Sequence, residues 1–198
     1  MLTATEHIDF VQVAQKGMSL PNLTSGMAVK PLTQIVSLSA ETGKRVRCRI
    51  VLDTASQVSL ISMSMVKELG LVTSQDGRCR ISGVGGNCGP VVLGVTNVAI
   101  GPVGGGPKGI LTVQIVRKIC DRIPFVTNED KIRKLASYGY CVSDCATEVE
   151  AAATEIGVLI GVDSLWGYIV GTPFFHESGV ILINTLGGWC VAKKEMIT

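Results

Sequence analysis

One carboxylate in the sequence stands where a charge is costly. Asp53 follows the apolar run Ile50–Leu52 and opens the small-residue turn Thr54–Ser56, which leads into a second, largely apolar run, Val58–Ile61. A turn can be built from Asn, Gly or Pro without any charge, whereas a carboxylate between two buried runs must be hydrogen-bonded or paired. The pattern therefore indicates that Asp53 has a chemical role.

The strands that would position Asp53 follow from the spacing of apolar residues. Leu32–Leu38 is predicted to be a strand, Glu41–Lys44 a turn, and Val46–Leu52 a second strand in which apolar residues alternate with arginines, so that a hairpin ends at Asp53. Ser62 is predicted to cap a helix that runs through Leu69 and stops at Gly70. Further strands are predicted at Val58–Ile61, Pro90–Ile100, Ile110–Val116, Ile156–Ile160, Val180–Ile183 and Trp189–Val191, and further helices within residues 128–153 and at Ser164–Tyr168.

Three motifs in order carry a resemblance to a known family. The string Leu52–Ile61 resembles the Asp-Ser/Thr-Gly active-site turn of retroviral-type aspartic proteases, and with Glu68–Leu71 it is similar to the protease segment of BEL/Pao-type retrotransposon polyproteins. The glycine cluster Ile81–Gly86 and the apolar-apolar-Gly segment Val158–Asp163 stand where that family has similar segments. Ile183–Trp189 is similar to the strand that precedes the reverse transcriptase there.

The resemblance implies a mainly-β fold. We expect a closed β-barrel of the retroviral acid-protease type with a glycine-rich flap hairpin and a few short helices, acting as a homodimer. The protease domain would span residues 29–198. Residues 1–28 show no clear period and are predicted to form an N-terminal arm or an extended segment.

The resemblance also implies a mechanism, in which two aspartates hold one water and share one proton, and the ionised aspartate accepts a proton as the water attacks a peptide carbonyl. The chain has one matching turn, because Asp163 is followed by Ser164 and Leu165 and lacks the small third residue. Asp53 of each of two copies would therefore face its twin across a two-fold axis. The expected reaction is cleavage of peptide bonds in the retroelement's own polyprotein.

Other site residues follow by the same resemblance. Thr54 is expected to hydrogen-bond across to the partner turn, and Ala55 stands where the family often has Gly. Gly83, Val84, Gly85 and Gly86 are predicted to form the tip of a flap over an extended substrate.

Beneath the turn, Ser56, Ile160 and Gly161 are expected to give structural support. Asp163 is predicted to cap a helix.

Composition narrows the function classes. Seven cysteines, an odd number without a secretory signal, favour reduced structural thiols, and neither a metal nor a cofactor is expected. A formal charge of +2 does not suggest nucleic acid, and Arg45, Arg47 and Arg49 are predicted to form a solvated strand face. Apolar runs stay shorter than the about 18 residues of a membrane span. We expect an intracellular protein, in the cytoplasm or within virus-like particles.

Two other function classes stay open beside the peptidase. One is a protease-like domain without activity that serves as a dimerisation or peptide-binding module. The other is a β-barrel binding domain in which Asp53 merely caps a turn. The arrangement of cleft and flap separates the last class from the first two, and a hydrolysis assay separates those two.

Overall fold

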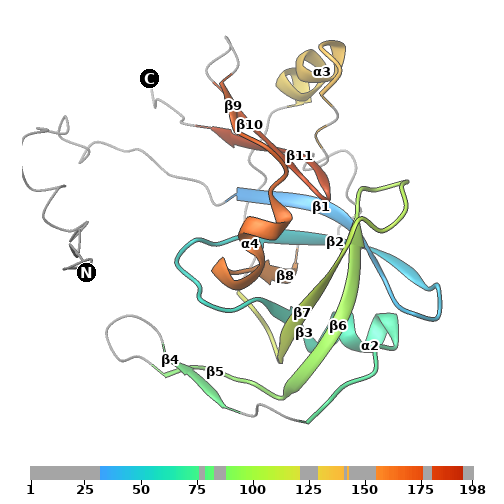
Figure 1. The fold of residues 1–198 in the computed structure, drawn as a ribbon, viewed down its shortest axis with the longest axis vertical. Helices are drawn as coiled ribbons and strands as arrows, with labels where there is room; N and C mark the ends of the chain where they lie inside the picture. Colours follow the sequence, from blue (N-terminus) through green and yellow to red (C-terminus); the bar gives the residue numbers. More distant parts are fainter. Residues whose placement is uncertain are drawn as a thin grey trace, which may run out of the picture. The chain divides into compact units, whose positions relative to one another are not determined.

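The computed structural model describes residues 32–75, 79–82, 88–120, 129–140, 142, 155–175 and 180–193, all within one compact unit, Val29–Lys194. The arm predicted at residues 1–28 lies outside the described residues. Figure 1 shows the order of the elements along the chain. They are β1 (Leu32–Ser39), β2 (Arg45–Leu52), β3 (Leu60–Ser62), α2 (Met63–Leu69), β4 (Arg80–Ser82), β5 (Cys88–Val91), β6 (Gly94–Gly101), β7 (Gly109–Val116), α3 (Glu129–Ser137), β8 (Ile156–Ile160), α4 (Val162–Tyr168), β9 (Phe174–Phe175), β10 (Val180–Thr185) and β11 (Gly188–Lys193).

Six strands close into a barrel in the order β1-β2-β8-β3-β7-β6. The pairs β2–β8 and β3–β7 are parallel, and the remaining pairs are antiparallel. Strand β8 therefore lies between β2 and β3, the two strands that flank the Asp53 turn in the sequence. The mainly-β fold with a closed barrel and a few short helices, expected above, is confirmed at this level.

The barrel is filled by branched apolar side chains from every one of its strands. Because successive side chains of a strand point to opposite faces, alternate residues face the interior. Buried members of this core include Val36, Leu38, Ile50, Leu52, Ile61, Ile100, Val113, Ile115, Val158 and Ile160. The predicted first hairpin is confirmed, with Leu32 opposite Leu52 and Ser39 opposite Arg45.

The prediction of a solvated arginine face is wrong for Arg49. Arg45 and Arg47 are exposed, but Arg49 is only 1% exposed and donates a hydrogen bond from its guanidinium to the hydroxyl of Thr33 at 3.0 Å. Strand β2 is paired on both sides, with β1 and with β8, and its register against β8 shifts between Arg49 and Ile50. Cys48, Ile50 and Leu52 belong to the barrel core and Arg49 does not, so the alternation of β2 continues and Arg49 lies on its other face. That face is also covered, because Thr33 and Ile35 of β1 are buried as well.

Both ends of helix α2 match the prediction. The side chain of Ser62 accepts a hydrogen bond from the backbone N–H of Met65, and Gly70 ends the helix in the left-handed conformation at φ 68°. That conformation costs glycine little because it has no Cβ. The strand predicted at Pro90–Ile100 is instead divided into β5 and β6, because Val92 and Leu93 turn their N–H groups to Cys79 and Ile115.

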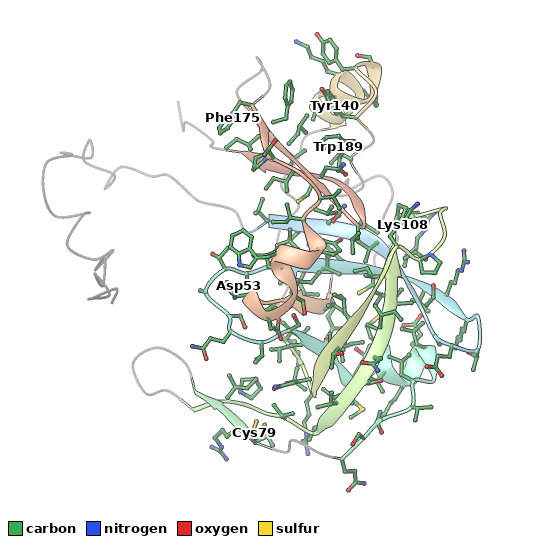
Figure 2. All side chains as sticks on the ribbon, in the orientation of Figure 1. Asp53, Cys79, Lys108, Tyr140, Phe175 and Trp189 are labelled. Carbon is green, nitrogen blue, oxygen red and sulfur yellow. The ribbon has the colours of Figure 1, made fainter. Side chains whose placement is uncertain are left out.

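Outside the barrel, β11, β10 and β9 form a three-stranded sheet. Tyr140, which follows α3, packs edge-on against Trp189 of β11 at a centroid distance of 5.1 Å and stacks on Phe174 of β9 at 6.0 Å. Figure 2 shows Tyr140, Trp189 and Phe175 near α3 and β9, away from Asp53. Among the described helices, none is long and apolar enough to cross a membrane.

Candidate functional site: the Asp53 turn

Asp53 is the first residue after β2. Its backbone N–H donates to the carbonyl oxygen of Ile160, the last residue of β8, at 3.0 Å. Because Leu52 and Ile160 are partners in the parallel pair, β2 and β8 end at the same level and the turn begins there. Asp53 is half-buried and lies near α4 in Figure 2.

The turn is closed by hydrogen bonds to Asp53 itself. Oδ1 of Asp53 accepts from the N–H of Ala55 at 2.9 Å, and the carbonyl oxygen of Asp53 accepts from the N–H of Ser56 at 3.3 Å. A carboxylate that bonds the backbone two residues on is the typical Asx turn. Among the described residues, none is hydrogen-bonded to Oδ2. One oxygen of Asp53 is thus fixed by the turn itself.

Thr54 and Ala55, the other two predicted catalytic-turn residues, are exposed. The methyl group of Ala55 therefore does not have to fit into the protein interior. The hydroxyl of Thr54 has no hydrogen-bond partner among the described residues.

The turn rests on the segment that follows β8. The hydroxyl of Ser56 donates to the carbonyl oxygen of Val58 at 2.9 Å, and the carbonyl oxygen of Ser56 accepts from the N–H of Val162 at 2.9 Å. A Cβ at Gly161 would lie 2.5 Å from the carbonyl oxygen of Val58 and 2.9 Å from that of Ser56. Only glycine permits this close backbone approach.

Ser59, which sequence reasoning did not single out, ends the loop that begins at Asp53. It is fully buried, and it is bonded to Asp163 of α4 through its N–H at 2.9 Å and its hydroxyl at 2.6 Å. The hydroxyl oxygen also accepts from the N–H of Gly161 at 3.0 Å, and the carbonyl oxygen of Ser59 accepts from the N–H of Gln114 at 2.9 Å.

The predicted cap role of Asp163 is therefore wrong. Gly161 occupies the N-cap position of α4 and Asp163 lies in the first turn, where both of its oxygens face Ser59 instead of the helix N–H groups. The sequence signals for this pair were a serine between two apolar residues, Val58 and Leu60, and an aspartate two positions after a glycine that ends an apolar run.

Helix α4 is itself anchored to the barrel by buried side chains. Leu165 and Tyr168 are buried, and the hydroxyl of Tyr168 donates to the side-chain oxygen of Gln34 in β1 at 2.8 Å. Burial raises the pKa of the Tyr168 phenol well above its usual value, so the phenol stays neutral. The support beneath Asp53 is thus continuous with the barrel core.

Of the predicted site residues, Asp53, Ser56, Ile160 and Gly161 are brought together in one place. Gly83, Val84, Gly85 and Gly86 lie outside the described residues, between the paired strands β4 and β5. A concave region of about 700 Å³ lies between β7 and α4, and Asp53 does not line it. Asp53 thus lies at a turn outside this concave region.

Two of the described cysteines are buried in the core. Cys48 and Cys190 are buried, and burial raises the pKa of the Cys48 thiol to about 12. Such a thiol remains protonated at neutral pH and is a poor nucleophile. Cys79 is exposed and precedes β4.

No protein-family model matches the chain, and no curated protein is significantly similar to it.

Proposed function

We propose that this protein is an aspartic endopeptidase that works as a homodimer. The two copies of Asp53 together activate one water. The observation that carries the proposal is the state of the Asp53 carboxylate. It stands at the end of a buried strand, and one of its oxygens accepts from the N–H of Ala55, whereas the other has no bond among the described residues. The backbone beneath the turn approaches so closely at Gly161 that only glycine fits there. The resemblance to retroviral-type proteases of BEL/Pao elements supports the same conclusion.

A single carboxylate does not complete this chemistry. The reaction requires two aspartates around one water, one ionised and one protonated, so that one accepts a proton while the other donates a hydrogen bond to the substrate carbonyl. Asp163 is not available as the second one, because both of its oxygens accept from Ser59. A second copy of Asp53, related by a two-fold axis, supplies the missing carboxylate in the proposed enzyme.

The outer face of α4 supports a partner next to the turn. Val162 and Trp166 are four residues apart on one helix face, and they are 39% and 71% exposed although both are apolar. Val162 is also the residue whose N–H bonds to Ser56 of the turn. A twin chain brought close enough for its Asp53 to share a water would lie beside this face, so we propose that the face becomes part of the dimer interface.

The substrate in this proposal is an extended polypeptide from the element's own polyprotein. Strands β4 and β5 pair antiparallel, with Ser82 opposite Cys88, and the glycine-rich segment Gly83–Gly86 stands between them in the sequence. We assign this segment the role of a flap that donates backbone hydrogen bonds to the substrate and excludes water from the site.

The retained alternative is a protease-like module that binds a partner without hydrolysis. Its supporting observation is that the concave region of about 700 Å³ lies at β7 and α4 and not at Asp53.

One incubation tests the proposal. The protein is mixed with a long unstructured polypeptide at mildly acid pH, with and without a pepsin-type transition-state inhibitor, and fragments are identified by mass spectrometry. We expect cleavage that the inhibitor suppresses. Absence of cleavage by a protein shown by light scattering to be dimeric would favour the binding module.

A further inference from the structure

Ser59 uses every polar group that it has, and its bonds lead to three different parts of the fold. Its N–H and hydroxyl donate to Asp163 of α4, its hydroxyl oxygen accepts from Gly161, and its carbonyl oxygen accepts from Gln114 of β7. The residue is buried, so none of these groups can turn to water without a rearrangement. Ser59 thus joins α4, β7 and the end of β8.

The acceptor in this arrangement is an exposed carboxylate. Asp163 contributes Oδ2 to the N–H and Oδ1 to the hydroxyl of the same residue, at 2.9 and 2.6 Å. Hydrogen bonds to an ionised acceptor are shorter and stronger than those between neutral groups, and two of them to one residue fix its orientation as well as its distance. We call these two bonds the Asp163–Ser59 bracket.

The bracket holds the far end of the loop that carries Asp53. At the near end, the N–H of Asp53 is bonded to Ile160; in the middle, the carbonyl oxygen of Ser56 is bonded to Val162. All three contacts lead to the single segment 160–163. The two contacts nearer Asp53 are backbone bonds, whereas the third depends on a side chain that substitution can remove.

We propose that Asp163 is a positioning residue that acts through Ser59 to hold the loop 53–59, and with it the Asp53 carboxylate, in a single conformation. The consequence for catalysis rests on the proposed function; the effect on the loop does not. Catalytic groups misplaced by about 1 Å can lose on the order of 100-fold in rate, so a loosened loop would lower kcat. Substrate binding along the flap would change little.

A competing role for Asp163 makes a different prediction. A negative charge in the first turn of α4 also interacts favourably with the helix dipole. Asp163→Glu keeps that charge, but its longer side chain does not fit both donors of Ser59 at the present backbone separation. Asp163→Asn keeps the shape and loses the charge. If Asp163 served only the helix, Asp163→Glu would behave as the unmodified protein.

The experiment measures backbone hydrogen exchange in peptides that cover residues 53–59, together with kcat and KM, for Asp163→Asn, Asp163→Glu and Ser59→Ala. Glu41→Gln, which removes an exposed carboxylate in the β1–β2 turn, is the matched control. All proteins are compared at concentrations where light scattering shows the same dimer fraction.

We expect both Asp163 variants to exchange about 10-fold faster in the loop, and kcat to fall about 10- to 100-fold with KM within about 2-fold, as is typical for residues that orient a catalytic group. The double variant Asp163→Asn/Ser59→Ala should lose less than the sum of the two single variants, because both substitutions break the same hydroxyl contact. Should Ser59→Ala fail to fold, the two Asp163 variants decide the matter on their own.

Unchanged loop exchange in Asp163→Asn, or exchange and kcat in Asp163→Glu equal to those of the unmodified protein, would show that Asp163 does not hold the loop. Faster exchange with an unchanged kcat would overturn the positioning role and leave the peptidase intact. If the unmodified dimer cleaves no peptide, the proposed function fails and the catalytic part of the inference fails with it, whereas the exchange data still decide whether Asp163 holds the loop.

Discussion

The backbone nitrogen of Asp53 donates a hydrogen bond to the carbonyl oxygen of Ile160 at 3.0 Å. The end of β8 thus fixes the position of Asp53 at the end of β2. Three residues later the same support continues from Val162 to Ser56 at 2.9 Å. The turn is therefore supported by the barrel and is not a free loop. Conservative substitutions in it can test the role of single side chains.

Asp53→Asn should reduce peptide hydrolysis by at least about 100-fold, because the amide cannot accept the proton of the attacking water. The fold should persist, since the side-chain oxygen of Asn can still accept from Ala55 N–H. Glu68→Gln, which removes an exposed carboxylate on α2, is the control and should keep full activity. Hydrolysis by Asp53→Asn at the normal rate would disprove the aspartic mechanism.

Activity per chain should rise with protein concentration and then level off, because one Asp53 per copy leaves the monomer inactive. Light scattering over the same range shows whether the plateau coincides with dimer formation. A constant specific activity in samples that scatter as monomers contradicts the proposed dimer.

Trp166→Ala should raise the dimer dissociation constant by about 10- to 100-fold, as expected when a buried interface tryptophan is truncated. Val72→Ala is the matched control, because Val72 is 86% exposed and lies after α2. Sedimentation velocity measures both. Equal dissociation constants for the two variants would place the interface elsewhere than on α4.

The rate of peptide cleavage should pass through a maximum on the acid side of neutrality. A pair of carboxylates that shares one proton works only between its two macroscopic ionisation steps, so the rate falls at both lower and higher pH. A substrate without titrating groups, assayed from about pH 3 to pH 9, reports the enzyme alone. A rate that climbs steadily to alkaline pH would instead indicate a cysteine or serine nucleophile.

Gly161→Ala should destabilise the fold by about 1 to 3 kcal/mol, because the added methyl group overlaps the backbone of Val58 and the structure must shift to admit it. Gly167→Ala, in the same helix region, meets no atom within 4 Å and should be neutral or stabilising by up to about 1 kcal/mol. Urea unfolding of the pair provides the comparison. Equal stabilities would mean that the turn does not rest on Gly161.

Stability should decrease as the pH rises above 9, in part because of Cys48. Its thiol has an ordinary value of 9.0 and a folded pKa of about 12, so between these values the unfolded chain ionises and the folded chain does not. Each pH unit in this window then costs about 1.4 kcal/mol of folding free energy. Between pH 9 and 11, the free energy of unfolding of Cys48→Val should fall less steeply with pH than that of the unmodified protein. Cys79→Ser should match the unmodified protein. The same pH dependence in Cys48→Val and the unmodified protein would contradict the prediction.

The elements that depend on local pattern could be predicted from the sequence. Strands β1, β2, β7 and β8 followed from their apolar runs, and α2 followed from its capping residues Ser62 and Gly70. The Asp53 turn was recognised because a carboxylate there needs a special environment. In each case the physical cause lies within about ten residues of its effect.

The features that depend on distant pairing could not be predicted. Arg49 is buried beside Thr33 of β1, and no local pattern shows that this face of β2 is covered. The partner of Ser59 is 104 positions away, so the sequence offered only a polar residue in one segment and a helix-capping type of residue in the other. Strand β9 is two residues long and carries no period at all.

The parallel pairing of β2 with β8 has a consequence for the order of folding. The Asp53 loop is supported by residues more than a hundred positions further along the chain, and contacts of such long sequence separation form slowly because a large loop must close first. During synthesis, the hairpin of β1 and β2 can form long before β8 and α4 have left the ribosome. A chain cut off before residue 160 would contain Asp53 and every residue of its turn, yet it would lack the support that holds them. In the proposed enzyme, the site would thus be complete only when the barrel is complete, and hydrolysis would start only after the domain has been made in full.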